Sequence, residues 1–408
     1  MQKLHAAAVL GILLLTGCAG VPPASVPAQT PAPALAAPCP ACPACPPATV
    51  VTPSLPPAKP LQPAAWQDME GWADDDLAAA WPAFLQSCRG LAGRPQGAAW
   101  KRVCAQAKKL DSSQAGVLRS FFEANFRPYA VVAADGNSAG LITGYYEPLL
   151  KGSRQGGRSY PTPVLGVPDD LVTVDLGELY PDLKHLRLRG RLVGKKVVPY
   201  YSRGEITAQD GKVPARTLLW VEDPVEFFFL QVQGSGRVRL PDGSLVRLAY
   251  ADQNGHPYHS IGRLLIERGE LKLEDASMQG IQAWGRANPA RLADLLNANP
   301  SYVFFREAPS SNDGPTGSLG VPLVAGRSLA VDPRAIPLGA PVFLSTTRPN
   351  SAQPLNRLML AQDTGGAIKG AVRADFFWGF GKEAGEQAGR MRQTGRLWVL
   401  LPAEAAPK

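Results

Sequence analysis

Ala361-Gln-Asp-Thr-Gly-Gly-Ala-Ile-Lys-Gly370, continued by Ala371-Val-Arg-Ala-Asp-Phe-Phe-Trp-Gly-Phe-Gly381, is the most informative stretch of this 408-residue chain. It sets two aspartates, Asp363 and Asp375, twelve positions apart. Five glycines lie around them and let the backbone approach a ligand closely. The stretch is therefore typical of a binding segment that carries two carboxyl groups.

The second aspartate adjoins an apolar aromatic run, Phe376-Phe-Trp378. A carboxyl group against aromatic surface is poorly hydrated, which raises its pKa because burial disfavours the charged form. A carboxylic acid that is neutral near pH 7 can give a proton to a leaving oxygen. The residues predict Asp375 as a catalytic acid, with Asp363 close by. The alternative is a glycine-rich turn between two strands with solvated aspartates.

The N-terminus indicates where the protein is located. Lys3 precedes an apolar run over residues 6–15, which is too short to span a bilayer and fits a signal peptide over residues 1–17. The ending Leu15-Thr-Gly-Cys18 is similar to the bacterial lipobox, and this resemblance implies a lipidated Cys18. Ala19, in place of Asp, implies the Gram-negative outer membrane, on its periplasmic face. The alternative is an ordinary signal peptide with Cys18 discarded.

Residues 18–65 are rich in proline and alanine, and we expect them to form an extended tether. The tether contains Cys39, Cys42 and Cys45, for which disulfides in the tether or between molecules are favoured over a metal site. Neither a second Cys-x-x-Cys pair nor a histidine lies near them. Beyond the tether, we expect Cys88 and Cys104 to form a disulfide, because the periplasm is oxidising.

The formal charge of +8 favours a polyanionic partner. We expect no nucleic-acid partner for an exported lipoprotein, so a wall polymer with carboxylate-bearing stems is the natural electrostatic partner. The alternative is that the excess of lysine and arginine only aids solubility. No residue identifies a partner among the wall-synthesis proteins.

The hydrophobic pattern predicts a mainly β fold with a helical N-terminal region. Helical spacing dominates from Trp66 to Phe126, with one helix expected to start near Asp75-Asp76 and another over residues 112–125. Two further helices are expected over 275–287 and from Asn288-Pro289 to the stop at Asn299-Pro300. Short strand-like runs occupy 139–146, 218–221, 227–233, 321–331, 342–344, 358–362 and 397–401.

Several motifs occur in an order that resembles one family, the membrane-bound lytic murein transglycosylases A. The resemblance covers residues 141–401. The motifs are Gly144-Tyr-Tyr-Glu-Pro148, Phe229-Leu-Gln-Val-Gln-Gly-Ser-Gly236, Asn254-Gly-His-Pro-Tyr-His-Ser-Ile-Gly262, Asn299-Pro-Ser-Tyr-Val-Phe-Phe305, Val321-Pro-Leu-Val324 with Asp332, and Asp363-Thr-Gly-Gly-Ala-Ile-Lys-Gly370.

The resemblance implies a fold, a substrate and a reaction. Residues 66–145 and 306–403 would form a domain that resembles a double-psi β-barrel, and 146–305 a second β-barrel domain inserted into it, with a groove between the two. The substrate would be the glycan strand of peptidoglycan. Cleavage of the MurNAc–GlcNAc β-1,4 bond would leave 1,6-anhydro-MurNAc ends, and no cofactor is needed. Asp375 occupies the position of the family's catalytic aspartate, and Asp363 that of its auxiliary carboxylate.

Further residues are candidates for substrate binding. The hydroxyls of Tyr145 and Tyr146 and the amides of Gly365 and Gly366 would position the sugar acetamido groups. For the tyrosines, half-buried packing in a strand is the competing interpretation. Gln231 and Gln233 alternate along the expected strand 227–233, so they could line a polar groove.

Three other classes of protein are alternative interpretations of the sequence. Asp363-Thr-Gly365 resembles the aspartic protease signature, but that chemistry needs two such aspartates and the chain has no second copy. A metalloenzyme would have to use His185, His256 and His259, and a structural role in a turn is favoured for the last two. A non-catalytic peptidoglycan-binding lipoprotein remains the alternative to the enzyme.

Overall fold

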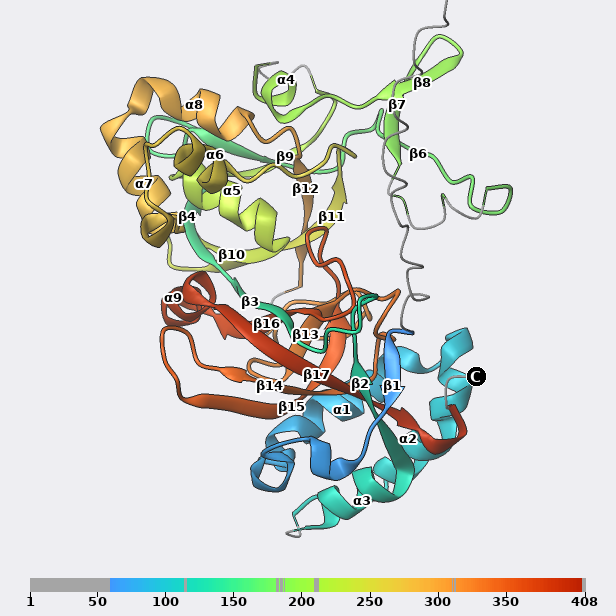
Figure 1. Cartoon of the computed structure of the whole chain (residues 1–408). Helices are drawn as coiled ribbons and strands as arrows, with labels where there is room; N and C mark the ends of the chain where they lie inside the picture. The colour runs from blue at the N-terminus through green and yellow to red at the C-terminus, as the bar shows by residue number, and fades with distance from the viewer. Residues whose placement is uncertain are drawn as a thin grey trace, which may run out of the picture. The chain divides into compact units, whose positions relative to one another are not determined.

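The computed structural model describes residues 59–405, apart from 114–115, 181–182, 184–185, 187, 209–212, 310 and 312 (Figure 1). The expected signal peptide, Cys18, the three tether cysteines and His185 lie outside the described residues. Within the described part, no helix has the length and apolar character that crossing a membrane requires.

The described chain begins with short strand β1 (Leu61–Pro63) and a helical region. Its helices are α1 (Leu77–Leu91), α2 (Lys101–Ala107) and α3 (Val117–Asn125), preceded by the 3-10 turns Trp66–Asp68, Trp72–Asp74 and Pro95–Trp100. Asp76 caps α1, since its Oδ1 accepts a hydrogen bond from the amide of Ala79 at 3.3 Å. The helix expected from residue 112 begins only at Val117, because Gly116 before it has a positive φ of 80°.

Six strands pair in a closed ring. They pair in the order β3–β16–β13–β15–β14–β17, and β17 returns to pair with β3. Their bounds are β3 Gly140–Glu147, β13 Ser328–Val331, β14 Pro341–Thr347, β15 Pro354–Asp363, β16 Arg373–Phe380 and β17 Arg392–Pro402. The far half of β17 also pairs with β2 (Phe126–Val131), which pairs with β1. Such a ring is what a six-stranded barrel requires; the double-psi crossover stays a prediction.

A buried ion pair joins the helical region to this ring. Both carboxylate oxygens of Asp75 lie 3.0 Å from Nη1 of Arg327, and both side chains are almost fully buried. Asp75 also accepts the amide of Leu358 at 2.7 Å, while Arg327 donates to the carbonyls of Leu358 and Asp76. Because every charge is matched, the pair fixes where α1 meets the strands, and removing one partner alone would leave an uncompensated buried charge.

A second set of strands lies between β3 and β13 in the sequence. Its pairing order is β12-β11-β10-β4-β9-β5, which is open among the described residues, so closure of a second barrel stays a prediction. The strands are β4 Leu149–Ser153, β5 Thr162–Leu165, β9 Thr217–Val221, β10 Ser235–Arg239, β11 Leu245–Gln253 and β12 Val303–Ala308. A small sheet is formed by β6 (Val172–Thr173), β7 (Arg189–Val193) and β8 (Lys196–Pro199).

Helices accompany these strands (Figure 1). They are α4 Arg203–Ala208, α5 Pro224–Gln233, α6 Ile261–Glu267, α7 Met278–Ala287 and α8 Pro289–Asn297, and the last helix of the chain, α9 (Gly381–Arg390), follows β16. The helix predicted to follow Asn288 is confirmed: it starts at Pro289 and stops before Asn299-Pro300. The run 321–331 is a strand only over its last four residues, β13.

The strand predicted over 227–233 is wrong, because this segment is helix α5. The side chain of Asp223 caps the helix, accepting from the amides of Val225 and Glu226 at 2.7 and 3.1 Å. Pro224 takes the first helical position, and Gly234 ends the helix with a φ of 79°. These start and stop signals outweighed the strand preference of the phenylalanine and valine residues between them.

Cys88 of α1 and Cys104 of α2 form a disulfide, with Cα atoms 5.5 Å apart. Their sequence separation is 16, so the loop they close is of the size for which the chain-entropy model gives about 3 kcal/mol. We expect the Cys88→Ser/Cys104→Ser variant to lose about that much free energy of unfolding in denaturant titrations. Reduction of the wild-type protein should give the same loss, and an unchanged transition midpoint in both experiments would contradict the expectation.

Candidate active site

The pairing register brings Asp363 and Asp375 to one face of the ring. Ala330, on β13, pairs with Asp375 of β16 on one side and with Asp363 of β15 on the other. Side chains in register point to the same face of a sheet, and strands lie about 4.8 Å apart, so the two Cα atoms are roughly 10 Å apart. Only the methyl group of Ala330 lies on the strand between them.

A bulge in β15 turns Asp363 to this face. Ala361 pairs with Leu329 and Asp363 with Ala330, so Gln362 is the extra residue. The Gln362 side chain is fully buried and points to the core, where its Nε2 donates to the Ala83 carbonyl of α1 at 2.8 Å. Without the bulge, alternation along the strand would put Asp363 into the core and Gln362 at the site.

Asp375 is positioned by strand β3. It pairs with Thr143, whose hydroxyl donates to Oδ1 of Asp375 at 2.5 Å. Nη2 of Arg373 donates to the same hydroxyl oxygen at 2.8 Å. Because a guanidinium can only donate, the hydroxyl proton of Thr143 is directed at Asp375. Thr143 and Arg373 are site residues that the sequence interpretation did not single out.

The carboxyl group of Asp375 is only partly exposed. Burial raises its pKa to about 6, while the hydrogen bond from Thr143 and the charge of Arg373 act in the opposite direction. Of the three aromatic residues that follow Asp375, only Phe377 shares its face, in a small apolar cluster with Tyr145 and Ala330. Phe376 points the other way, into the main core. Burial thus raises the pKa of Asp375 as expected, although only one of the three aromatic rings that follow it lies on its side of the strand.

Asp363 has a different environment, rich in donors. Its Oδ1 accepts from the amide and hydroxyl of Ser318, at 2.9 and 2.8 Å, and from the amide of Thr364 at 2.9 Å. Its Oδ2 accepts from the hydroxyl of Tyr145 at 3.2 Å. Burial raises the pKa of Asp363, and these hydrogen bonds oppose the increase. The carboxyl group thus holds the Ser318 loop and Tyr145 in place.

The glycine segment after Asp363 is tied to β13 by a third aspartate. Oδ2 of Asp332 accepts from the amide of Gly370 at 2.9 Å, and Arg334 pairs with the same oxygen at 2.6 Å. The arginine hydrogen bonds hold the pKa of Asp332 well below its usual range. Between these anchors, Gly366 is exposed, and a Cβ added there would meet nothing within 4 Å. The segment therefore leaves backbone open beside the aspartates.

The two tyrosines of the Gly144-Tyr-Tyr-Glu-Pro148 motif point to opposite sides of β3. Tyr145 is buried at the site, with its ring 5.1 Å from that of Phe377, and burial raises its pKa well above the usual value. Tyr146 points to the other side of β3, where its ring lies against Gly385 of α9. Its hydroxyl lies 3.7 Å from Sδ of Met278. Tyr146 is thus a packing residue, which is the alternative that the sequence left open.

The two glutamines are not neighbours on a groove, because they lie on helix α5. Gln231 is buried and bonded to Nη1 of Arg203 at 2.6 Å and to the carbonyl of Val303 at 2.9 Å. Its role is to satisfy the buried guanidinium, whose pKa is lowered to about 10 by burial. Gln233 accepts from the backbone amide of Tyr146 at 3.1 Å. The alternation along a strand, from which the polar groove was predicted, is therefore wrong, and contact of Gln233 with a sugar stays a prediction.

The two histidines of the motif from Asn254 to Gly262 make hydrogen bonds that hold neighbouring segments together. A ring nitrogen of His256, Nε2, lies 2.7 Å from the carbonyl of Tyr200, and the amide of His259 donates to Asn299 at 3.0 Å. No group of three or more potential metal ligands occurs among the described residues. A turn role, as favoured from the sequence, accounts for both.

Two protein-family models match the chain: the "MltA specific insert domain" over residues 141–306 and the "3D domain" over residues 327–401. The membrane-bound lytic murein transglycosylase A of Escherichia coli (strain K12) is 36% identical over 297 residues, which is 69% of this chain and 72% of that protein.

Solved structures agree with the sequence relatives. MltA from Neisseria gonorrhoeae is 42% identical, with a TM-score of 0.74, over 85% of this chain and 94% of that chain. Escherichia coli MltA with bound chitohexaose is 29% identical, with a TM-score of 0.61, over 85% of this chain and 93% of that chain. The chain therefore belongs to the lytic murein transglycosylase A family.

Proposed function

We propose that this protein is a lytic transglycosylase that cleaves the MurNAc–GlcNAc β-1,4 bond of peptidoglycan and leaves 1,6-anhydro-MurNAc ends. The observation that carries the proposal is the environment of Asp375, a partly exposed carboxyl group whose pKa burial raises to about 6, on the same face of the ring as Asp363. Family membership and the sugar oligomer bound by the Escherichia coli relative support a glycan substrate.

The first step is proton transfer from Asp375 to the glycosidic oxygen. As the bond from C1 to that oxygen breaks, the departing sugar takes the proton and becomes a free 4-hydroxyl. Thr143 engages Oδ1 of Asp375, and among the described residues Oδ2 has no hydrogen-bond donor, so Oδ2 is the oxygen that faces the substrate. A pKa near 6 keeps part of the enzyme in the acid form near neutral pH.

The second step closes the anhydro ring. The C6 hydroxyl of the same MurNAc attacks C1, and the carboxylate of Asp375 accepts the hydroxyl proton. The nucleophile is part of the reacting sugar, so its effective concentration is very high and no water is consumed. At the end Asp375 is protonated again, and one side chain has served both halves of the reaction.

Asp363 acts as an auxiliary carboxylate in this scheme. Hydrolases that form a covalent intermediate need a free carboxylate about 5–5.5 Å from the acid. Both oxygens of Asp363 are instead occupied, by Ser318, Thr364 and Tyr145. Asp363 orients Tyr145 and contributes negative charge near the cation that develops at C1. The open amides around Gly365 and Gly366 and the hydroxyl of Tyr145 are placed to contact the sugar.

Location follows from the N-terminal residues. We propose that Cys18 carries the lipid and that it anchors the protein to the periplasmic face of the outer membrane, with residues 18–65 as tether. The names of the relatives, which describe membrane-bound enzymes, support association with a membrane.

Digestion of purified sacculi tests the reaction directly. We expect the wild-type protein to release muropeptides with anhydro ends, identified by mass spectrometry, and the Asp375→Asn variant to release none at an unchanged melting temperature. Asn is similar in shape but cannot donate an acidic proton. Reducing ends would indicate a hydrolase, and binding without release would indicate a wall-binding lipoprotein.

The pH dependence tests the role of the Thr143 hydroxyl. Because the acid form of free Asp375 is required, kcat/KM should fall as pH rises through about 6. The hydrogen bond from Thr143 favours the ionised form, so Thr143→Val should move this fall to higher pH and lower kcat, while Thr143→Ser restores both. A profile that does not move in Thr143→Val would show that the hydroxyl does not act on Asp375.

Lipidation has its own test. The Cys18→Ala variant should fail to incorporate radiolabelled palmitate and should appear in the soluble periplasmic fraction, because its anchor is missing. Labelled Cys18→Ala protein would place the lipid elsewhere.

A further inference from the structure

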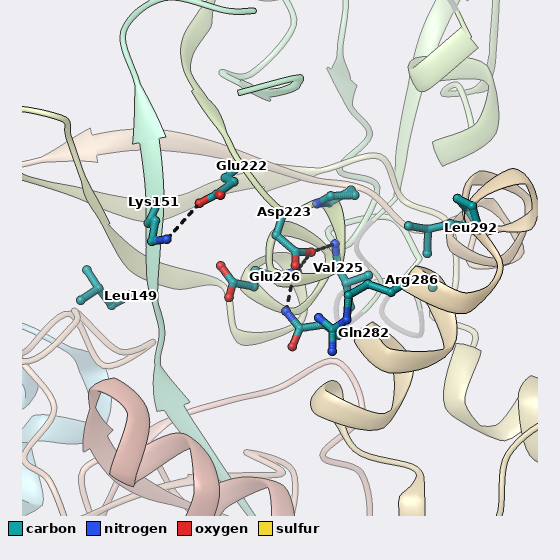
Figure 2. A pocket seen from close by; sticks show the side chains of 12 residues that line it. Leu149, Lys151, Glu222, Asp223, Val225, Glu226, Gln282, Arg286 and Leu292 are labelled. Carbon is teal, nitrogen blue, oxygen red and sulfur yellow. Dashed lines mark hydrogen bonds and ion pairs between the residues drawn. The ribbon is translucent and has the colours of Figure 1, made fainter. Parts of the chain in front are cut away.

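A cavity of about 610 Å³ in the inserted region carries charged groups of both signs on its wall. Strand β4, the turn after β9, the first turn of α5, and helices α7 and α8 supply its lining (Figure 2). Neither Asp363 nor Asp375 takes part in it, and none of its residues has a role in the steps above. The cavity therefore has no assigned occupant.

Three carboxylates lie on its wall, and an ion pair within 4.0 Å is present only at Glu222 among them, within the described residues. Glu222 lies 3.4 Å from Nζ of Lys151. Asp223 caps α5 and accepts from Nε2 of Gln282 at 2.9 Å (Figure 2). The third, Glu226, is half-buried and has a hydrogen bond with the side chain of Gln282, but within the described residues no lysine or arginine nitrogen lies within 4.0 Å of its carboxylate. Burial and then the charge of Asp223 raise the pKa of Glu226, so a cation placed beside it would be stabilised.

Arg286 supplies the opposite charge. It lines the same cavity from the last turn of α7, is exposed, and has no carboxylate partner within 4.0 Å among the described residues. A cation is favoured at a helix C-terminus in any case, so its charge alone indicates no ligand. Its position on a cavity wall shared with Glu226 is what matters, because one molecule can reach both charges.

The cavity adjoins the strand that carries the catalytic face. Leu149, at its edge, follows Tyr145 by four residues, and four residues of extended chain span at most about 14 Å. Tyr146 lies between them and is close enough to Glu226 that burial and this negative charge together raise its pKa to about 12. The edge of the cavity therefore lies within about 14 Å of Tyr145, on the side of β3 to which Tyr146 points.

We propose that this cavity binds the peptide stem of the substrate, with an ammonium group of the stem at Glu226 and a carboxylate at Arg286. A stem that ends in a diamino acid offers both groups on one residue. A tripeptide that ends in such a residue spans about 10 Å in extended form, which is within the limit of about 14 Å between Tyr145 and Leu149. The inference rests on the proposed function, since it places a glycan strand across Asp375.

Paired substrates test the proposal in the full-length protein. Glycan strands with stems are compared with the same strands after an amidase has removed the stems. We expect Glu226→Gln and Arg286→Gln each to lower kcat/KM at least fivefold on stem-bearing strands and to leave it unchanged on stripped strands. Glu274→Gln is the matched control, because Glu274 is an exposed carboxylate in the same region but outside the cavity. Equal effects on both substrates would overturn the proposal.

A binding measurement separates this proposal from the proposed function. The free tripeptide Ala–γ-Glu–diaminopimelate, titrated by calorimetry, should bind wild-type protein and the Asp375→Asn variant equally. It should bind at least fivefold more weakly to Glu226→Gln and Arg286→Gln, or after acetylation of its side-chain amine. Absent or unchanged binding overturns the cavity's role. Binding by a protein that cleaves neither substrate would overturn the proposed function and leave the cavity's role standing.

Discussion

The bulge at Gln362 is the constraint on which the candidate site depends. Because of the bulge, Asp363 pairs with Ala330, which also pairs with Asp375, so the two aspartates lie on one face of the sheet. It is held by the core, because the amide of Gln362 bonds to α1 while its Oε1 accepts from Ser328 at 2.6 Å. The N-terminal helix is thus coupled to the chemistry: it supplies the polar partners that keep an amide, and not a carboxylate, in the interior. A regular strand would bury Asp363 at a large cost in desolvation.

The two aspartates of the site have different surroundings. One aspartate is kept poorly hydrated and in contact with a single hydroxyl donor, so that its proton affinity is high. The other is surrounded by donors and serves as a structural centre for Tyr145 and Ser318. Two carboxyl groups on one sheet face thereby acquire different roles from their surroundings alone. The proposed mechanism fits this asymmetry, because in it the substrate supplies the nucleophile and only one acid is needed.

Part of the fold and of the candidate site could be predicted from the sequence. The two aspartates, the helical start of the chain and the helix after Asn288 follow from local signals. Helix α5 was missed although Asp223-Pro224 and Gly234 mark its ends, because its apolar run also suits a strand. Thr143 and Arg373 could not be found, since their roles depend on the pairing of β3 with β16. The bulge at Gln362 could not be predicted from the local sequence, because a polar residue is not expected to point into the core. It does so because its side-chain amide contacts the carbonyl of Ala83 and the hydroxyl of Ser87 on α1.

The pairing of β3 with β16 has a consequence for the order of folding. Thr143 and Asp375 are 232 positions apart, and the whole inserted region lies between them. Contacts between such distant residues form late unless the intervening chain is already ordered, because closing a long loop costs entropy before any contact stabilises it. We expect the inserted strands to fold first and shorten that loop. A partly folded molecule would then lack the contact of the Thr143 hydroxyl with Asp375, so that the candidate site would be completed only in the last step of folding.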